Sequence, residues 1–316
     1  MSRLFLGIDT SNYKTSLAVI DENGSIVFNK SEYLDVKQGE RGLRQSDAFF
    51  KQSNNLPAFV KEAFSAINTS DIAGIGVSIR PRRLEGSYMP CFLAGYNLAQ
   101  ELGAALDVPV YKFSHQEGHA AAVIDASCFD ANERILFCHL SGGTTELLLC
   151  SKDDEGYNMQ IVGGTKDISI GQLIDRIGVE LGYAFPSGMY LDKIAASNIS
   201  NSSIIPKIIL EQGYFNLSGI ETKLIRYISE EHTAEELNSM VAELFSKIAD
   251  LLHRSIEYVK ETYNVETVYL AGGVASSENV RHLLSQYNYK FGRPELSGDN
   301  AVGIANLARM QHEIMR

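Results

Sequence analysis

Apolar stretches along the chain are broken in the same way at two places, by a short turn rich in glycine and in small hydroxyl residues. Each place shows an apolar arm, a polar bend and a second apolar arm, which is the pattern of a β-hairpin. The first comprises Leu4–Asp9, Thr10–Lys14 and Thr15–Ile20, and the second comprises Ile135–Leu140, Ser141–Thr144 and Thr145–Cys150. The repetition predicts two lobes of similar topology.

The rest of the pattern alternates between helical and strand periodicity. It predicts helices over Asn55–Ile67, Pro90–Leu106, Ile170–Gly182, Ala234–Tyr263 and Asn300–Met310, and strands over Ile72–Ile79, Val108–Phe113 and Thr267–Ala271. The Ser- and Asn-rich stretch Asn198–Ser203 is expected to be an exposed loop. Such alternation indicates an α/β fold, in which helices flank mixed sheets and the functional site lies between the halves.

A chain of 316 residues is long enough for two domains or lobes. We expect an N-terminal lobe over 1–130, completed by a C-terminal helix over 300–316, and a C-terminal lobe over 131–299. Asp9 interrupts the first apolar stretch, and no stretch approaches the roughly 18 apolar residues of a membrane helix. We therefore expect a cytoplasmic protein without a membrane partner.

The net charge and the cysteine pattern argue against some classes of protein. The net charge of −11 argues against a protein that binds nucleic acid unaided, because phosphate contacts need clustered Lys and Arg. Arg80, Arg82 and Arg83 form the one tight basic cluster of the sequence. The four cysteines, at irregular spacings without a Cys-x-x-Cys pair, are expected to be reduced and mostly buried: Cys91, Cys128, Cys138 and Cys150.

A histidine pair is the first candidate for chemistry. His115 and His119 stand four residues apart, so on a helix both rings project from one face and can bind one metal ion. Asp299 is our choice for a third ligand, because it lies on a Gly-containing turn before the last predicted helix, from which a carboxylate can reach across a cleft; His139 and Glu117 are weaker choices. An accidental surface pair is the alternative, and two His with one carboxylate suit Fe, Zn or Mn.

Glu117 invites comparison with the metallopeptidase motif His-Glu-x-x-His. In that motif the glutamate directly follows the first histidine, whereas here Gln116 holds that position and Glu117 lies about a hundred degrees further around a helix. Metal-dependent proteolysis is therefore a distant third among the candidate functions.

Three glycine pairs form the second candidate site. They occur in Ser141-Gly142-Gly143-Thr144, in Gly163-Gly164 and in Gly272-Gly273, and the first and last directly follow apolar strands. Such turns let backbone N–H groups approach phosphate oxygens, although a lone Gly-Gly pair is usually an ordinary turn. A nucleotide or phosphate site is favoured, while the P-loop and Rossmann fingerprints are absent from the sequence.

Four aspartates could serve this site. Asp9 ends the first strand, where it could orient a metal or water or simply cap the turn that follows. Asp167 could cap the helix that begins after it. Asp175 is our choice for a carboxylate that bonds ribose hydroxyls, while a solvated surface role is the default for Asp175 and Asp192.

The order of motifs along the chain resembles the TsaD family, the tRNA adenosine threonylcarbamoyltransferases once called O-sialoglycoprotein endopeptidases. The resemblance covers nearly the whole chain, and its most specific part is His115-Gln-Glu-Gly-His119. The other motifs are Leu-Gly-Ile-Asp-Thr-Ser, Leu-Ser-Gly-Gly-Thr-Thr-Glu, Gly171-x-x-x-Asp175-Arg176, Asn216-Leu-Ser-Gly-Ile, Leu-Ala-Gly-Gly-Val and Gly-Asp299-Asn-Ala. It implies an actin-like ATPase fold, shared with sugar kinases and heat-shock chaperones, with two similar lobes around a central cleft.

The resemblance also implies roles for residues. His115, His119 and Asp299 would hold iron or zinc, Gly142 and Gly143 would lie near phosphate, Asp175 and Gly188 near the ribose, and Gly272 and Gly273 near the nucleotide. We therefore assign catalysis to Asp9 and Glu117, and nucleotide or substrate contacts to Ser141, Gly142, Gly143, Thr144, Asp175, Gly188, Asp192, Gly272, Gly273 and Ser277. The reaction would pass a threonylcarbamoyl group, or a related carbamoyl group, from an adenylate to an adenosine amine of tRNA.

Several positions depart from the family's pattern and indicate a divergent paralogue. Thr144 replaces a His, Gln172, Ile174 and Arg176 replace Glu, Phe and Lys, Ser277 replaces an Asn, and Arg80-Pro81-Arg82-Arg83 replaces Gly-Pro-Gly-Leu. The alternative function is a non-catalytic nucleotide-binding partner or regulator of such a transferase. The expected ligands are one divalent metal ion and ATP, AMP or an acyl-adenylate. tRNA is expected to bind with the help of partner proteins, and a homodimer or heterodimer with an actin-like-fold partner is expected.

Overall fold

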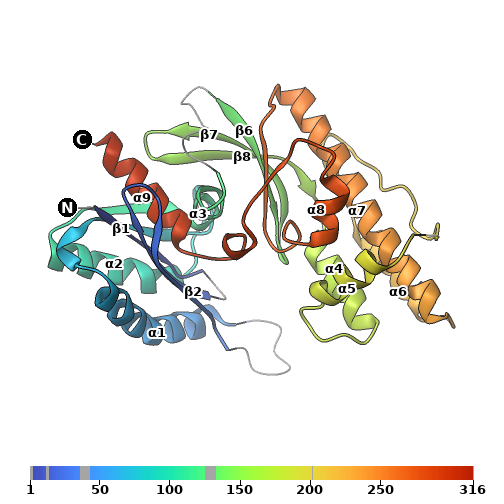
Figure 1. Cartoon of the computed structure of the whole chain (residues 1–316), viewed down its shortest axis with the longest axis horizontal. Coiled ribbons are helices and arrows are strands. Elements are labelled where there is room, and N and C mark those ends of the chain that lie inside the picture. The colour runs from blue at the N-terminus through green and yellow to red at the C-terminus, as the bar shows by residue number, and fades with distance from the viewer. Residues whose placement is uncertain (1–2, 12–13, 36–42, 125–132, 201, 316) are drawn as a thin grey trace. The chain divides into compact units, whose positions relative to one another are not determined.

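The computed structural model describes residues 3–11, 14–35, 43–124, 133–200 and 202–315 (Figure 1). The chain divides into two compact units. Unit 1 comprises 1–132, 152–159 and 299–316, and unit 2 comprises 133–151 and 160–298. Cys128, for which a buried thiol is expected, lies outside the described residues.

Unit 1 is built on a five-stranded sheet in the order β3-β2-β1-β4-β5. The strands are β1 (Leu4–Asp9), β2 (Lys14–Asp21), β3 (Ile26–Tyr33), β4 (Ile72–Arg80) and β5 (Val110–Ser114). The first three strands pair antiparallel, and β1, β4 and β5 run parallel. The carboxyl ends of these three parallel strands therefore meet at one edge of the sheet.

Helices cover both faces of this sheet: α1 (Gln45–Ala66) and α2 (Phe92–Leu106) on one, α9 (Val302–Ile314) on the other. Because side chains alternate along a strand, Leu6 and Ile8 pack into the core beneath α1 and α2, while Gly7 between them faces α9. A Cβ atom on Gly7 would overlap the Ala301 carbonyl oxygen. The start of α9 consequently lies directly on the backbone of β1.

Unit 2 contains a six-stranded sheet in the order β11-β10-β6-β7-β8-β9. The strands are β6 (Arg134–Leu140), β7 (Thr145–Asp153), β8 (Gly156–Thr165), β9 (Tyr214–Phe215), β10 (Val268–Ala271) and β11 (Lys290–Phe291). The helices are α4 (Ile170–Glu180), α5 (Gly188–Ser197), α6 (Ser218–Ile228), α7 (Ala234–Tyr263) and α8 (Glu278–Leu284). Its core includes the apolar face of α7 and that of α4.

The two sheets repeat one topology. In each, a hairpin's first strand, β1 or β6, has its antiparallel partner on one side and a later parallel strand, β4 or β10, on the other. A further parallel strand, β5 or β11, follows outside. The similar topology predicted from the two hairpin patterns is thus confirmed.

Local sequence signals determine both ends of helix α7. Thr233 caps its start in a capping box with Glu236, and Asn264 ends it in the left-handed conformation with a φ of 51°. The predicted bounds are confirmed there, whereas α1 begins ten residues before the expected Asn55.

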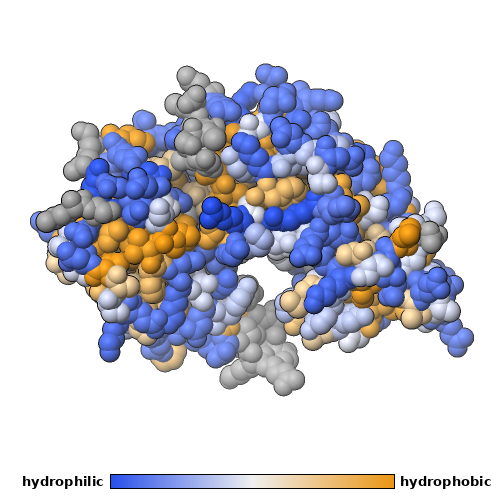
Figure 2. Space-filling model, viewed as in Figure 1, coloured by the Kyte–Doolittle hydropathy of each residue, from blue (hydrophilic) through white to orange (hydrophobic). Residues whose placement is uncertain are grey.

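No helix of the described residues is long and apolar enough to cross a membrane. Figure 2 shows hydrophilic side chains over much of the face in view, with apolar patches between them. Cys91, Cys138 and Cys150 are buried free thiols, as expected. Burial raises the pKa of the Cys91 thiol, with a smaller contribution from Asp9, to about 12.

Candidate metal centre and nucleotide-binding turns

The short helix α3 (His115–Ala121) follows directly on β5 and carries both histidines. Ser114 caps it: its side chain accepts from the Glu117 N–H, and the Glu117 carboxylate accepts from the Ser114 N–H. Because α3 is helical from its first residue, His115 and His119 lie on one face, with their Nε2 atoms 3.0 Å apart.

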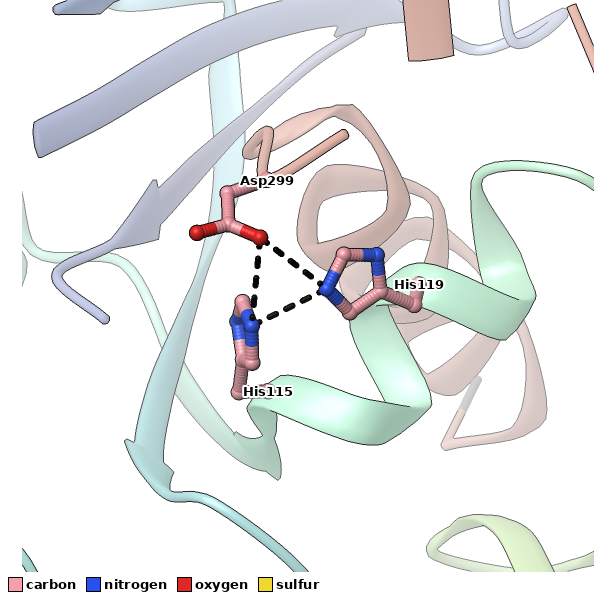
Figure 3. Close-up of side chains that lie close together, drawn as sticks. All are labelled: His115, His119 and Asp299. Carbon is pink, nitrogen blue, oxygen red and sulfur yellow. Dashed lines mark hydrogen bonds and ion pairs between the residues drawn. The ribbon is translucent and has the colours of Figure 1, made fainter. Parts of the chain in front are cut away.

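Asp299 completes the cluster from the segment that leads into α9 (Figure 3). One of its oxygens, Oδ1, lies 3.3 Å from His119 Nε2 and 3.6 Å from His115 Nε2. All three residues belong to unit 1. The expectation that Asp299 reaches the histidines across a cleft is therefore wrong, because it meets them within one compact unit.

Close packing between α3 and α9 brings Asp299 to the histidines. Gly118 on α3 faces Gly303 on α9, and a Cβ atom on Gly303 would overlap the Gly118 carbonyl oxygen. The side chain of Asn306 further along α9 donates to the Ala121 carbonyl at 3.3 Å. The small residues of α9 let this helix approach α3 and β1 of unit 1 closely.

Asp9, at the end of β1, binds Nδ1 of His115, the ring nitrogen that does not face His119. Its two carboxylate oxygens lie 3.0 and 3.1 Å from His115 Nδ1, and Ser78 Oγ donates to it as well. Because a carboxylate oxygen accepts, Nδ1 of His115 donates to Asp9, which leaves Nε2 as the ring nitrogen that can bind an ion. Ser11 Oγ donates to the other oxygen of Asp299 at 3.1 Å.

Neighbouring groups of opposite charge shift the pKa values of His115 and Asp299. Burial alone would lower the pKa of His115, but the carboxylates of Asp9 and Asp299 raise it well above its ordinary value of 6.5. Burial would likewise raise the pKa of Asp299, yet the His115 and His119 rings hold it well below 3.8. The Asp299 carboxylate is therefore ionised at neutral pH.

This donor set suits a transition metal. Two imidazole nitrogens and one carboxylate oxygen lie within 4.8 Å of one another, and two Nε2 atoms that face each other at 3.0 Å require a proton or a cation to share. A His whose second nitrogen donates to a carboxylate is the usual arrangement around a protein-bound metal. Two His and one carboxylate leave further coordination positions for water or substrate.

Glu117 and His139 lie outside the cluster. Glu117 is buried, and its carboxylate accepts from the Ser114 N–H and hydroxyl at 2.7 Å and from the Tyr157 N–H at 3.3 Å. These bonds fix the start of α3 and connect it to Tyr157 of β8. The contacts of Glu117 therefore stabilise the local structure and do not include the histidines. His139 is buried in β6 of unit 2, where its ring stacks on Phe137.

Two of the three glycine pairs form turns that come together in unit 2, whereas Gly163-Gly164 lies within strand β8 and is not a turn. The turn after β6 is closed by the Ser141 N–H, which donates to the Thr144 carbonyl, and by the Thr144 N–H, which donates to Ser141 Oγ. The turn after β10 lies beside it, because the Val274 N–H donates to the Leu140 carbonyl and Gly272, with a φ of 106°, approaches Leu140 too closely for any Cβ. Cβ atoms on Gly142, Gly143 and Gly273 would meet open space, so these turns present bare backbone.

Two aspartates near these turns, Asp175 and Asp192, cap helices that begin later in the chain. Asp175 Oδ1 accepts from the N–H groups of Ser187 and Gly188, at the start of α5. Asp192 accepts from Ser277 Oγ and from the Glu278 and Asn279 N–H groups, at the start of α8. The solvated surface role taken as their default is therefore wrong, since each binds a helix N-terminus.

Asp167 does not cap the helix that follows it. Ser169 caps α4, in a capping box with Gln172, and Asp167 instead accepts from the Leu217 and Ser218 N–H groups at the start of α6. Ser169 Oγ also donates to the Gly142 carbonyl at 2.7 Å, which ties the N-terminus of α4 to the first glycine turn.

Sequence reasoning missed several residues that build the site. The Ser114-x-x-Glu117 capping box was visible in the sequence and would have placed the start of α3. The contact between Gly118 and Gly303 had no such signal, because the two glycines lie far apart in the chain. Ser11 and Ser78, which bond Asp299 and Asp9, are ordinary serines on and near strands and had no signal either.

Solved structures define the class of fold. The chain is similar over 99% of its length to component A of (R)-2-hydroxyglutaryl-CoA dehydratase from Acidaminococcus fermentans, with 99% of that chain covered, a TM-score of 0.55 and 14% identity. A ROK family glucokinase from Streptomyces griseus matches 97% of this chain and 99% of its own, with a TM-score of 0.51 and 14% identity. These likenesses place the protein in the class with the actin-like ATPase fold.

The sequence identifies the family within that class. The model of the TsaD family, described as tRNA N6-adenosine threonylcarbamoyltransferase, matches residues 34–306, and the chain belongs to this family. A tRNA N6-adenosine threonylcarbamoyltransferase of Listeria monocytogenes serotype 4b is 28% identical over 96% of this chain and 89% of its own length. One from Thermotoga neapolitana is 25% identical over 95% of this chain and 91% of its own. The resemblance read from the motifs is confirmed.

Proposed function

We propose that this protein is a metal-dependent transferase of the tRNA threonylcarbamoyladenosine type. It passes a threonylcarbamoyl group from an adenylate to the exocyclic amine of an adenosine in tRNA. A carbon–nitrogen bond to the amine forms, the bond from the acyl carbon to the phosphate oxygen breaks, AMP leaves, and the amine loses a proton. The observation that carries the proposal is the cluster of His115, His119 and Asp299 in a chain of the TsaD family.

The residues of unit 1 have distinct roles in this proposal. His115, His119 and Asp299 would hold an iron or zinc ion, which when bound supplies Lewis-acid polarisation of the acyl oxygen. Asp9 keeps the Nδ1 proton of His115 in place and so fixes which ring nitrogen faces the ion. Ser11 Oγ orients the second oxygen of Asp299. Glu117 acts by positioning α3.

Unit 2 would bind the nucleotide part of the substrate. Gly142, Gly143 and Gly273 have no neighbour where a Cβ would stand, so phosphate oxygens can approach their backbone. The N-terminus of α4 adds a positive helix-dipole end beside the first glycine turn. Ser141, Thr144, Asp175, Gly188, Asp192, Gly272 and Ser277 would shape these turns or contact the adenylate.

The charge balance bears on the tRNA partner. At −11 the chain repels a polyanion, and of the basic cluster Arg83 is already paired with Asp153 and Glu155. We therefore propose that tRNA binds with the help of partner proteins, among them one of the same fold that forms a dimer with this chain.

A transfer assay tests the function. Purified protein, loaded with iron or zinc, is incubated with threonylcarbamoyl-adenylate, unmodified tRNA and the partner proteins of a family member. We expect modified adenosine in the digested tRNA and AMP in stoichiometric amount, and we expect neither product from His119→Ala. Absence of both products with the wild type would show that the chain is not such a transferase.

A further inference from the structure

The edge of the unit 1 sheet that carries the metal cluster has a cationic residue on its middle strand. The parallel strands lie in the order β1-β4-β5, and they end at Asp9, Arg80 and Ser114 respectively. The Cα of Arg80 is the pairing partner of Ser114, and His115 is the next residue along the chain. Arg80 therefore ends the strand that lies between β1, which ends at Asp9, and β5, which leads into His115.

The segment after Arg80 is held in place by bonds that use its neighbours. The Gln116 N–H in the first turn of α3 donates to the Pro81 carbonyl at 3.1 Å. The guanidinium of Arg83 binds the carboxylate of Asp153 at 2.8 and 3.0 Å and that of Glu155 at 2.5 Å. These contacts fix the segment against α3 without involving the Arg80 side chain.

Arg80 itself is half-buried, and its Nε atom is shielded from solvent with no hydrogen-bond partner among the described residues. The carboxylates of the cluster already have partners: Asp9 binds Ser78 and His115, and Asp299 binds Ser11 and the two histidines. A buried guanidinium N–H without a partner is costly, by about 1–3 kcal/mol, and its planar fork matches a carboxylate or a phosphate. An anionic group of a bound ligand would satisfy it.

We propose that Arg80 binds an anionic group of the substrate, a carboxylate or a phosphate, beside the metal cluster. This inference rests on the proposed transferase function and names a specificity-determining contact of that site. Arg80 would favour an acyl-adenylate whose transferred group, or whose phosphate, reaches the end of β4.

Binding measurements test the proposal without requiring turnover. Calorimetry measures the dissociation constants of threonylcarbamoyl-adenylate, of carbamoyl-adenylate, which lacks the carboxylate, and of AMP. The proteins are the wild type, Arg80→Met, Arg80→Lys and the control Arg82→Met, which removes one positive charge from the same segment. Melting temperatures verify that each variant is folded. If Arg80→Met does not fold, Arg80→Lys is the variant compared with the wild type.

We expect Arg80→Met to weaken binding roughly tenfold to a hundredfold, Arg80→Lys to weaken it less, and Arg82→Met to leave it close to wild type. A loss confined to threonylcarbamoyl-adenylate assigns the contact to the carboxylate, and an equal loss with all three ligands assigns it to the phosphate. Equal binding by the wild type and Arg80→Met, or an equal loss with Arg82→Met, overturns the Arg80 contact and leaves the transferase function standing. A wild type that binds none of the three ligands overturns both.

Discussion

Two buried carboxylates lie next to the histidine cluster, and their bonds give them different roles. Asp9 bonds His115 directly, whereas Glu117 bonds the backbone on either side of α3. The sequence marked both as catalytic candidates, Asp9 because it ends the first strand and Glu117 because it lies between the two histidines. Which groups each carboxylate faces depends on strand and helix geometry, and residue type does not encode this.

We expect Asp9→Asn to weaken metal binding about tenfold to a hundredfold, because the amide no longer enforces the Nδ1–H form of His115. Titration with a competing chelator measures the change. Asp107→Asn is the matched control: Asp107 is an exposed helix C-cap with a φ of 55°, a conformation that Asn also adopts. Unchanged affinity in Asp9→Asn would contradict the orienting role.

We expect Glu117→Gln to lower the free energy of unfolding by about 1–2 kcal/mol, because the capping box loses its charged acceptor. Metal content and the rate of transfer per folded molecule should stay near the wild-type values. Urea unfolding and the transfer assay provide the two readouts. If transfer is abolished while stability is unchanged, Glu117 takes part in the chemistry and the structural assignment is wrong.

At the scale of elements, the packing of α9 on α3 carries the metal site. We expect Gly303→Ala to lower the free energy of unfolding by roughly 1–3 kcal/mol and to reduce metal content, because the new methyl group overlaps the Gly118 carbonyl and displaces Asp299. Gly219→Ala is the control, since its Cβ meets nothing within 4 Å on helix α6 and should be neutral or slightly stabilising. Full metal content in Gly303→Ala would show that this packing does not position Asp299.

The cap that Asp167 places on α6 predicts a pH dependence. Partial burial would raise the pKa of Asp167, but bonds from Ser218 and Leu217 outweigh it and hold the pKa at about 2. A depressed pKa in the folded state means that the stabilisation is complete above about pH 4 and is lost as the pH falls toward 2. The difference in unfolding free energy between wild type and Asp167→Asn should therefore shrink over this range, as measured by urea unfolding at several pH values. A constant difference would contradict the cap.

The same long-range caps explain which elements sequence reasoning missed. The hairpins, α4 and α7 have apolar periodicity and, for the helices, local capping boxes, so the chain itself marks them. The helices α5, α6 and α8 begin where Asp175, Asp167 and Asp192 bind their N-termini from distant positions. Strand β3 was missed because it is largely exposed and lacks an apolar face.

At the scale of the whole molecule, the repeated sheet topology was readable from two hairpins, while the metal cluster needed tertiary structure. His115 and His119 are neighbours on one helix, so their spacing sufficed. Asp299 was predicted from its turn and from the family resemblance, but the reason for its position is the glycine contact between α3 and α9. The departures at Thr144, Gln172 and Ser277 belong to unit 2, whereas Arg80 belongs to unit 1, which carries the cluster of His115, His119 and Asp299.

The central claim is that His115, His119 and Asp299 bind one metal ion. Its most direct test is metal content per chain by mass spectrometry, for the wild type, His119→Ala and the control His282→Ala, which removes an exposed histidine outside the cluster. We expect close to one iron or zinc ion per chain in the wild type and in His282→Ala, and a loss of most of it in His119→Ala. A wild type that is free of metal and cannot be loaded, or a His119→Ala variant that retains its ion, would contradict the central claim.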